Sequence, residues 1–313
     1  LGLLRCSLSG PCPGSKMELL IENVPLSMLF LMAKILSATY IIVTVVAWLG
    51  NGLIVLVTIR SKKLHSTCNI LIAIQAFSDI IIQMSHLFFV YFAYSEQLVT
   101  FSTCWKINFL FVSAVDFSTW MVFFTALDRY LCAKYPQFYK SLNQAYYVGG
   151  IVTFCSIYCV AFKFITYLSL SDQSTLCLIS QSVTGSSQYI WLGGGTLINC
   201  GVVVVYYALT KIVKNVSSAE YQRINRSLNT MILVYLFGWL LTYLGCGMAN
   251  FMSTNERVFV SSQMIFGIFA NINIAAPVFI YYSRSTLYRQ EFRKFLGIGR
   301  GSRVTSMSFL NRN

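Results

Sequence analysis

Charged residues are scarce in this chain of 313 residues, and the acidic ones number only ten against 23 basic ones. Together they make up 11%, whereas a soluble globular protein carries about 25%. Hydrophobic residues reach 56%, and the mean hydropathy is +0.65. This composition excludes a soluble enzyme and predicts a single domain that crosses the membrane several times.

Histidine and proline are also rare. The two histidines, His65 and His86, lie far apart in the sequence, and no glycine-rich phosphate loop or catalytic nucleophile motif is present. Of the five prolines, only Pro277 falls inside an apolar segment. We therefore expect no enzymatic activity and no metal centre built from clustered side chains.

Seven apolar segments are long enough to cross a bilayer as helices. They cover residues 35–59, 69–91, 104–130, 145–168, 189–211, 228–251 and 258–282. Residues 283–296 then place Tyr288 and Phe292 on one helical face and Arg289 and Arg293 on the other. The predicted fold is an all-α membrane protein, a seven-transmembrane helix bundle followed by a short amphipathic helix on the inner membrane surface.

Basic residues gather at one face of this predicted bundle. Residues 60–65 contain three, residues 129–140 three, residues 211–226 four, and the chain from Arg284 onwards seven, so 17 of the 23 share a face. The positive-inside rule makes that face cytoplasmic and the amino terminus external. In a soluble chain the net charge of +13 would suggest nucleic acid, but this distribution indicates the lipid bilayer as the partner.

The two ends of the chain are expected to lie outside the bundle. Residues 1–34 form a predicted extracellular segment, and residues 297–313 a disordered cytoplasmic tail. Two interpretations of residues 1–16 stay open: an extracellular tail with a Cys6–Cys12 loop, or sequence upstream of a true start at Met17. Glycosylation sequons in the loop of residues 211–226 are interpreted as chance matches, because that loop is cytoplasmic.

Two cysteines, Cys104 and Cys177, both fall on the outer face of the predicted bundle. A disulfide between them would close a loop of about 70 residues. By lowering the entropy of the unfolded chain, such a bond would stabilise the fold by roughly 4 kcal/mol. Alternatively, they are buried thiols that pack as small hydrophobes. Their position favours the bond.

Carboxylates inside apolar helices are functional candidates, because a charge in the membrane is costly. Asp79 could be satisfied by Asn51, Ser118 and Asn273, with water or a sodium ion, or it could serve only as a hydrogen-bonded link between helices. Asp116 has two further interpretations, a ligand contact or a structural partner of the fourth or fifth helix. Lys163, near the end of the fourth segment, is expected to extend to the outer interface.

The triplet Asp128-Arg129-Tyr130 closes the third segment. Asp128 beside Arg129 is either a surface ion pair or a switchable lock, and a helix end on the basic face favours the lock. Arginine stays protonated in proteins, so its partner decides where it points. We expect Arg129 to pair with Asp128 at rest and to turn on activation towards Tyr206 or Tyr207, with Tyr281 closing from the seventh helix.

These features together resemble the rhodopsin-class G-protein-coupled receptors over about residues 35–296. The matching residues are Gly50-Asn51, Asp79, Cys104, Asp128-Arg129-Tyr130, Tyr135-Pro136, Cys177, Tyr281 and the terminal amphipathic helix. The stretches RSKKLHSTCNILIAIQAFSDI (residues 60–80) and ALDRYLCAKYPQFYKSLN (residues 126–143) are similar to the nematode serpentine chemoreceptors of the Srsx family. The resemblance implies a chemosensory receptor that binds an extracellular small molecule or peptide and activates a heterotrimeric G protein.

The resemblance is incomplete in its helix prolines. The sixth segment lacks the usual Cys-Trp-x-Pro, so Trp239 is expected to act as its aromatic switch. In the seventh, Pro277 stands four residues before Tyr281 instead of three. The residues implied in G-protein coupling are Asp128, Arg129, Tyr130, Tyr206, Tyr207 and Tyr281.

A ligand pocket is expected in the outer half of the bundle. Helix spacing turns six side chains inward there: Phe111, Asp116, Trp239, Tyr243, Gln263 and Asn271. Amine receptors of this class carry an aspartate at the position of Phe111, and visual pigments a lysine at that of Asn271, so neither an amine ligand nor retinal is expected. Two other hypotheses remain, a membrane transporter, for which no paired half-repeat is found, and a receptor-like chain that does not signal.

Overall fold

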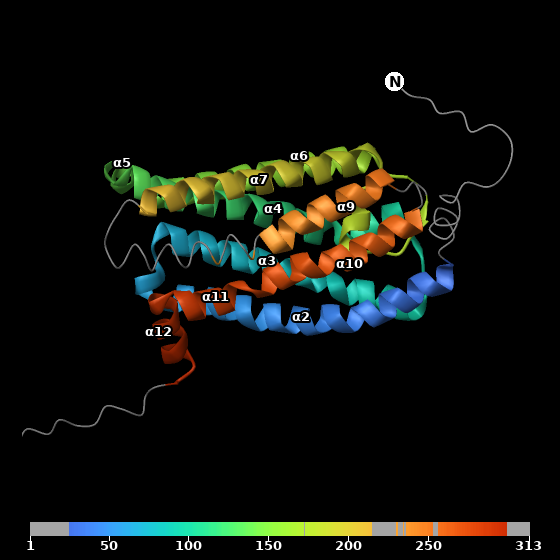
Figure 1. Cartoon of the computed structure of the whole chain (residues 1–313), viewed down its shortest axis with the longest axis horizontal. Helices are drawn as coiled ribbons and strands as arrows, with labels where there is room; N and C mark the ends of the chain where they lie inside the picture. Colours follow the sequence, from blue (N-terminus) through green and yellow to red (C-terminus); the bar gives the residue numbers. More distant parts are fainter. Residues whose placement is uncertain are drawn as a thin grey trace, which may run out of the picture.

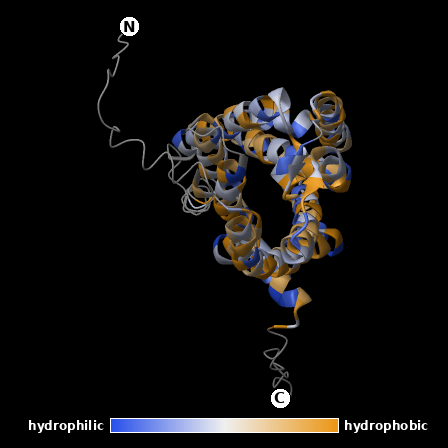
Figure 2. Cartoon of the chain, turned by 90° about the vertical axis from the view of Figure 1, so that its right-hand side faces the viewer, coloured by the Kyte–Doolittle hydropathy of each residue, from blue (hydrophilic) through white to orange (hydrophobic). Residues whose placement is uncertain are grey.

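The computed structural model describes residues 25–171, 173–214, 230, 234, 236–252 and 256–298 as a bundle of long helices (Figure 1). The predicted Cys6–Cys12 loop, the sequons and the tail from residue 299 lie outside the described residues. Viewed end-on, the helices form a ring with hydrophobic positions on all of them (Figure 2).

Six helices of the described chain are long and apolar enough to cross a membrane. They are α2 (Leu26–Arg60), α3 (Thr67–Ser95), α4 (Phe101–Lys134), α6 (Gln144–Leu168), α7 (Ser186–Lys214), and α10 (Glu256–Ala275) continued by α11 (Pro277–Arg284). The described part of the remaining predicted segment is a π-helical stretch, η3 (Leu236–Leu240), followed by α9 (Leu241–Met252). The chain is therefore a mostly helical, multi-pass membrane protein.

Helix α2 begins nine residues before the predicted start of its span. Lys34 lies inside the helix, and its Nζ contacts the Glu96 carboxylate at the end of α3 at 2.5 Å. This ion pair accommodates the lysine charge, so the apolar run from Leu26 continues as helix.

Helix α4 occupies the centre of the arrangement. It packs against α3, α6 and α7, while α2 packs against α3 and α10, and α9 lies between α7 and α10. It is also the most buried of the six candidate spans. Residues on different faces of α4 therefore reach three different neighbours.

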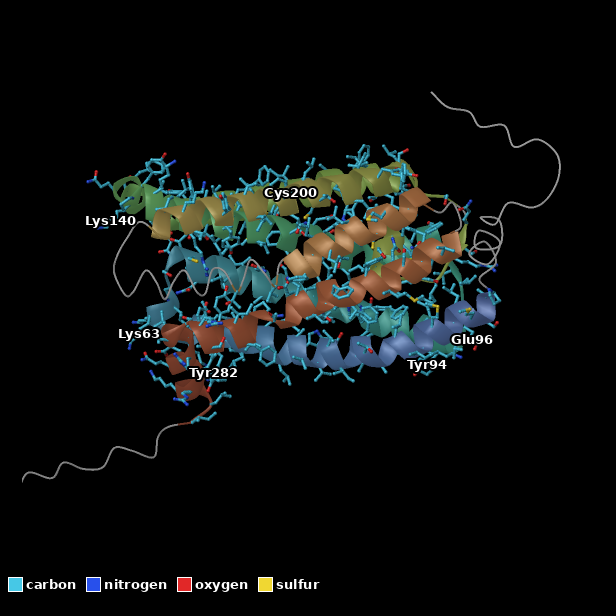
Figure 3. All side chains as sticks on the ribbon, in the orientation of Figure 1. Lys63, Tyr94, Glu96, Lys140, Cys200 and Tyr282 are labelled. Carbon is cyan, nitrogen blue, oxygen red and sulfur yellow. A yellow bond between two sulfur atoms is a disulfide. The ribbon has the colours of Figure 1, made fainter. Side chains whose placement is uncertain are left out.

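Short helices close the end of the bundle that the basic residues predict to be cytoplasmic, and we call it the inner end and the opposite one the outer end. These are η1 (Lys62–Leu64), α5 (Pro136–Ser141) and α12 (Thr286–Phe295). In α12, Tyr288 and Phe292 are buried in a cluster that includes Ile54 of α2, which anchors this helix against the bundle. Lys63 and Lys140 lie at this end, opposite Glu96 (Figure 3).

At the outer end, a two-stranded antiparallel sheet pairs β1 (Val99–Thr100) with β2 (Ser174–Thr175). A disulfide joins Cys104 to Cys177, with their Cα atoms 5.4 Å apart. A 3-10 turn, η2 (Ile179–Ser182), follows and packs against α4. Sheet and disulfide together hold this loop over the outer end of the bundle.

Candidate functional site

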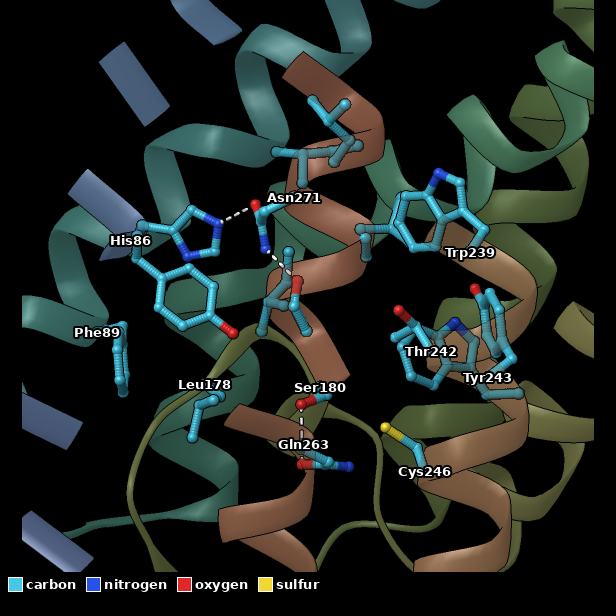
Figure 4. A pocket seen from close by; sticks show the side chains of 18 of the residues that line it. His86, Phe89, Leu178, Ser180, Trp239, Thr242, Tyr243, Cys246, Gln263 and Asn271 are labelled. Atoms are coloured by element: carbon cyan, nitrogen blue, oxygen red, sulfur yellow. Dashed lines mark hydrogen bonds between the residues drawn. The ribbon is translucent and has the colours of Figure 1, made fainter. Parts of the chain in front are cut away.

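A cavity of about 80 Å³ lies between η2 and Trp239 (Figure 4). Its wall is mostly apolar, as is usual for small-molecule sites. The residues that line it come from α2, α3, α4, the outer loop, α7, η3, α9 and α10: Tyr40, Ile82, His86, Phe89, Val115, Leu178, Ile179, Ser180, Trp191, Leu192, Trp239, Thr242, Tyr243, Cys246, Gln263, Gly267, Ala270, Asn271 and Ile274.

A chain of buried hydrogen bonds reaches the wall of the cavity at His86 and Asn271. Thr44 Oγ1 donates to Gln83 Oε1 at 2.8 Å, and Gln83 Nε2 donates to Asn271 Oδ1 at 2.7 Å. His86 Nε2 lies 2.6 Å from the same Asn271 oxygen, so this nitrogen is the donor. Asn271 thus satisfies donors from two positions of α3 and fixes the imidazole of His86 at the cavity wall.

The outer loop closes the cavity at the end nearest the disulfide. Ser180 Oγ donates to Gln263 Oε1 at 2.8 Å, and Gln181 Nε2 donates to the same oxygen. Asn108 Nδ2 contacts Cys177 Sγ at 3.1 Å, which ties the disulfide to α4. The loop is therefore held at both α4 and α10.

Four of the six predicted pocket residues line this cavity: Trp239, Tyr243, Gln263 and Asn271. Phe111 instead packs against Phe88 of α3, with ring centroids 5.7 Å apart. Asp116 turns towards α7, where its Oδ1 accepts a hydrogen bond from Trp191 Nε1 at 2.8 Å. Of the two interpretations of Asp116, this contact supports the structural partner on the fifth helix.

Sequence reasoning missed several lining residues, including Tyr40, His86, Ser180, Trp191 and Thr242. His86 carried a usable signal, because an ionisable side chain inside an apolar helix is a functional candidate. The loop residue Ser180 carried none, since its place depends on the disulfide.

Lys163 does not extend to the outer interface, contrary to the prediction. Its side chain is only 5% exposed, and its Nζ lies 5.4 Å above the centroid of the Phe109 ring. Packing of α6 on α4 turns the side chain towards the bundle, whereas the sequence predicted that it extends to the membrane surface.

The residues proposed to surround Asp79 are only partly brought together. Ser118 Oγ donates to Asp79 Oδ1 at 2.6 Å. Asn51 Nδ2 donates instead to the backbone oxygen of Ile274 at 3.1 Å, and Asn273 Nδ2 to that of Val234 at 2.8 Å. The two asparagines therefore tie α2 and the sixth helix to α10.

At the inner end of α4, Arg129 lies among residues of three other helices. Its Nε donates to Cys68 Sγ of α3 at 3.2 Å, and its guanidinium interacts electrostatically with Tyr206 of α7 and Tyr281 of α11. Tyr206 and Tyr281 are both buried. Tyr207, the other predicted partner, is 61% exposed and lies beneath Lys211 Nζ, 4.7 Å from its ring centroid.

Asp128 accepts a hydrogen bond from the Tyr139 hydroxyl of α5 at 2.8 Å, in place of the predicted pairing with Arg129. Partial burial, together with the Asp128 carboxylate, raises the pKa of Tyr139 above its usual range, so the phenol remains a donor. Tyr130 accepts from Lys134 Nζ at 2.8 Å. Asp128 thus holds the second inner loop, while Arg129 faces the helices.

Comparisons with known proteins agree with this geometry. A family model described as "Serpentine type 7TM GPCR chemoreceptor Srsx" matches residues 44–296. The chain is 25% identical over 156 residues to "Probable G-protein coupled receptor npr-8" of Caenorhabditis elegans, covering 48% of the chain and 30% of that protein. It is 27% identical over 126 residues to "C-C chemokine receptor type 4" of Homo sapiens, covering 40% and 34%.

These two matches span about a third of the length of each curated relative. The family match, by contrast, extends over most of this chain, from α2 through α12. The chain belongs to the serpentine type 7TM GPCR chemoreceptor family Srsx.

Proposed function

We propose that this protein is a chemosensory G-protein-coupled receptor that binds a small extracellular molecule and activates a heterotrimeric G protein. The observation that carries the proposal is the placement of two sites on α4 and its neighbours. A cavity lies near the outer end beneath a disulfide-held loop, and the half-buried Arg129, with Cys68, Tyr206 and Tyr281 around it, lies at the inner end.

The proposal includes a seventh span and an orientation. The sixth span is residues 228–251, and the membrane domain is residues 35–282, with the described helix α2 extending it to Leu26. The amino terminus is outside and the carboxyl terminus inside. Helix α12 lies on the inner membrane surface, since Arg289 and Arg293 stand opposite its buried face.

The cavity favours a compact ligand. Its volume of about 80 Å³ is well below the range of about 300–1,000 Å³ for drug-sized ligands. His86, Asn271 and Gln263 offer polar contacts at its edge, while the rest is apolar. A small, mostly apolar molecule with one or two hydrogen-bonding groups fits this chemistry better than a peptide, which would have to displace the outer loop.

The inner cluster would transmit the signal. Arg129 rests between Cys68, Tyr206 and Tyr281, so movement of α7 or α11 changes its surroundings directly. To change the receptor from 1% to 99% active, a ligand must bind the active state about 10⁴-fold more tightly. Asp128 holds α5 through Tyr139 and so shapes the surface that a G protein would contact.

A sodium ion beside Asp79 belongs to the proposal, with Asp79 and Ser118 as its protein ligands. Both offer oxygen atoms, and Ser118 is already within hydrogen-bonding distance of the carboxylate. The amide nitrogens of Asn51 and Asn273 donate to backbone carbonyls, which leaves their oxygens free of these bonds, and water would complete the coordination. We expect the receptor to have a higher melting temperature in NaCl than in KCl. In the Asp79→Asn variant this difference should disappear.

Guanine-nucleotide exchange in membranes that contain the receptor tests the function. A panel of odorants and neuropeptides is screened first, and the active compound is then applied to Arg129→Ala. We expect ligand binding to persist and nucleotide exchange to fall to background, because the variant lacks the guanidinium that contacts Cys68 and interacts with Tyr206 and Tyr281. Arg284→Ala, an exposed arginine at the same end, is the matched control and should couple normally. Normal exchange by Arg129→Ala would refute the proposed coupling role of Arg129. Transport of the compound without nucleotide exchange would refute the proposal that the protein is a receptor.

A further inference from the structure

One backbone carbonyl fixes the direction of the hydrogen bonds around His86. Asn271 Nδ2 donates to the backbone oxygen of Gly267 at 2.8 Å, and a carbonyl oxygen can only accept, so the orientation of the Asn271 amide is determined. Its Oδ1 is therefore the acceptor for both Gln83 and His86. The imidazole accordingly carries a proton on Nε2, the nitrogen that faces Asn271 (Figure 4).

The other ring nitrogen of His86, Nδ1, is an acceptor. Among the described residues that line the cavity none is acidic, and an imidazolium without a counter-charge is costly to bury, so the ring is neutral. A neutral imidazole with its proton on Nε2 has a lone pair and no proton on Nδ1. At Nδ1 the ring can therefore accept a hydrogen bond and cannot donate one.

Nδ1 of His86 has no hydrogen-bond partner within the described chain. Tyr40 lies against the ring, with the two centroids 4.7 Å apart, but its hydroxyl donates to the backbone oxygen of Met264 at 2.8 Å. His86 is only 6% exposed, yet Nδ1 is not one of the unpartnered atoms that the described residues enclose completely. The open space beside this residue is the ligand cavity, so Nδ1 is available to a ligand there.

Two hydroxyl groups of the cavity wall are also left with lone pairs only. Ser180 Oγ donates its proton to Gln263 Oε1 at 2.8 Å. Thr242 Oγ1 donates to the backbone oxygen of Gly238 or of Phe266, at 2.9 and 2.8 Å. Each hydroxyl has a single proton, so neither can donate a second hydrogen bond to a ligand. The wall therefore offers several acceptors to whatever fills the cavity.

A ligand that fills the cavity excludes water from Nδ1 of His86. A ketone or ether oxygen at this place would leave the lone pair buried without a donor, which is unfavourable. A carboxylate has no proton to donate, and an ammonium would be buried without an acid. We infer that the cavity selects a small alcohol or phenol, whose hydroxyl donates to His86 Nδ1. This inference rests on the proposed function, because it names the ligand class of the same cavity.

Binding to the full receptor in nanodiscs, without a G protein, tests the inference separately from the function. Affinities are taken from the rise of the melting temperature with ligand concentration. Two matched sets are compared: 2-pentanol with 2-pentanone and 2-methoxypentane, and 1-phenylethanol with acetophenone and its methyl ether analogue. In at least one set the alcohol should bind about tenfold more tightly than the ketone and the ether.

The His86→Phe variant removes the acceptor and keeps a ring beside Tyr40. Its affinity for the alcohol should fall about tenfold, to the level of the ketone, while its affinity for the ketone stays unchanged. Ile82→Val, one turn earlier in α3 and also in the cavity wall, is the matched control. It should change the affinities for alcohol and ketone by the same factor, since it alters only the shape of the wall.

The position of the imidazole proton can be measured directly in the unchanged ring. The chain has two histidines, so His65→Gln leaves His86 as the single site of nitrogen-15 histidine labelling. We expect an unprotonated Nδ1 whose signal shifts on addition of the alcohol and not of the ketone. A protonated Nδ1, or an alcohol preference that persists in His86→Phe, would overturn the inference.

The binding and exchange measurements separate the inference from the proposed function. Tight binding of the alcohol without nucleotide exchange would uphold the ligand class and refute the coupling. Exchange driven equally by the ketone and the alcohol would uphold the receptor and overturn the ligand class. Absence of binding by both alcohols would also overturn it.

Discussion

Tyr206 and Tyr207 are adjacent in sequence, yet the helix turns them in opposite directions. Tyr206 is 5% exposed and interacts with Arg129, whereas Tyr207 is exposed beside Lys211. Removing the hydroxyl at each position compares a buried neighbour of Arg129, the proposed coupling residue, with a surface residue of the same type.

We therefore predict that Tyr206→Phe lowers ligand-stimulated nucleotide exchange several-fold while ligand binding stays unchanged. Tyr207→Phe should couple like the unchanged receptor. Exchange assays at matched surface expression measure both variants, and an equal loss in the two would assign no special role to Tyr206.

Asn271 is the shared acceptor of the buried polar chain, and no apolar side chain could replace it in that role. Asn271→Leu would leave the donors of Gln83 and His86 without their acceptor, at a cost of about 1–3 kcal/mol for each unsatisfied group. We expect a lower melting temperature in detergent and loss of ligand binding. Asn199→Leu, which removes only a bond to Gly195 within α7, is the matched control and should be milder.

At the scale of the element, the sixth helix replaces the absent proline by a π-helical stretch. The π-helical stretch is η3, and two residues before it the backbone oxygen of Val234 accepts a hydrogen bond from Asn273 Nδ2 at 2.8 Å. Gly238 makes room for this contact, because a side-chain carbon there would collide with Asn273. Next to Trp239, a glycine of the π-helical stretch thus packs directly against an asparagine of α10.

Gly238→Ala should destabilise the receptor by about 1–3 kcal/mol through overpacking and should impair signalling. Gly247→Ala, in the same helix segment with no atom within 4 Å of the added carbon, should be neutral or stabilising by about 0.5–1 kcal/mol. Thermal unfolding in detergent measures the difference. Equal melting temperatures for the two variants would argue against the proposed role of Gly238.

The outer loop is the second element whose form depends on a distant contact. Cys104→Ser and Cys177→Ser should reduce surface delivery alike, and the double variant should be no worse than either, since each removes the same bond. Cys200→Ser, an exposed free cysteine, should be delivered normally. Additive losses in the double variant would show that each cysteine acts separately.

At the scale of the whole molecule, the asymmetry of basic residues predicts the orientation. The segments that hold 17 of the 23 basic residues are predicted from the sequence to share one face, and Lys63 and Lys140 from two of these segments lie at the same end of the bundle, so that end should be cytoplasmic. Epitope tags at Met17 and Asn313 can be probed on intact cells. Only the Met17 tag should be labelled without permeabilisation, and labelling at Asn313 would reverse the topology.

The sequence alone determined the membrane class and six of the spans within a few residues at most ends, and it favoured a bond between Cys104 and Cys177 that the structure contains. Hydropathy and basic residues report these properties directly, because each depends on the transfer of whole segments from water to lipid. Four pocket residues, Trp239, Tyr243, Gln263 and Asn271, also followed from helix period and depth.

Tertiary structure alone decided where the polar side chains point. Lys163 is buried, Asn273 donates to the backbone oxygen of Val234, and Tyr206 rather than Tyr207 is buried and interacts with Arg129. In a membrane span nearly every face is apolar, so the sequence period does not define the rotation of one helix against the next. Packing around α4 defines it, and the polar groups take the partners that this packing supplies.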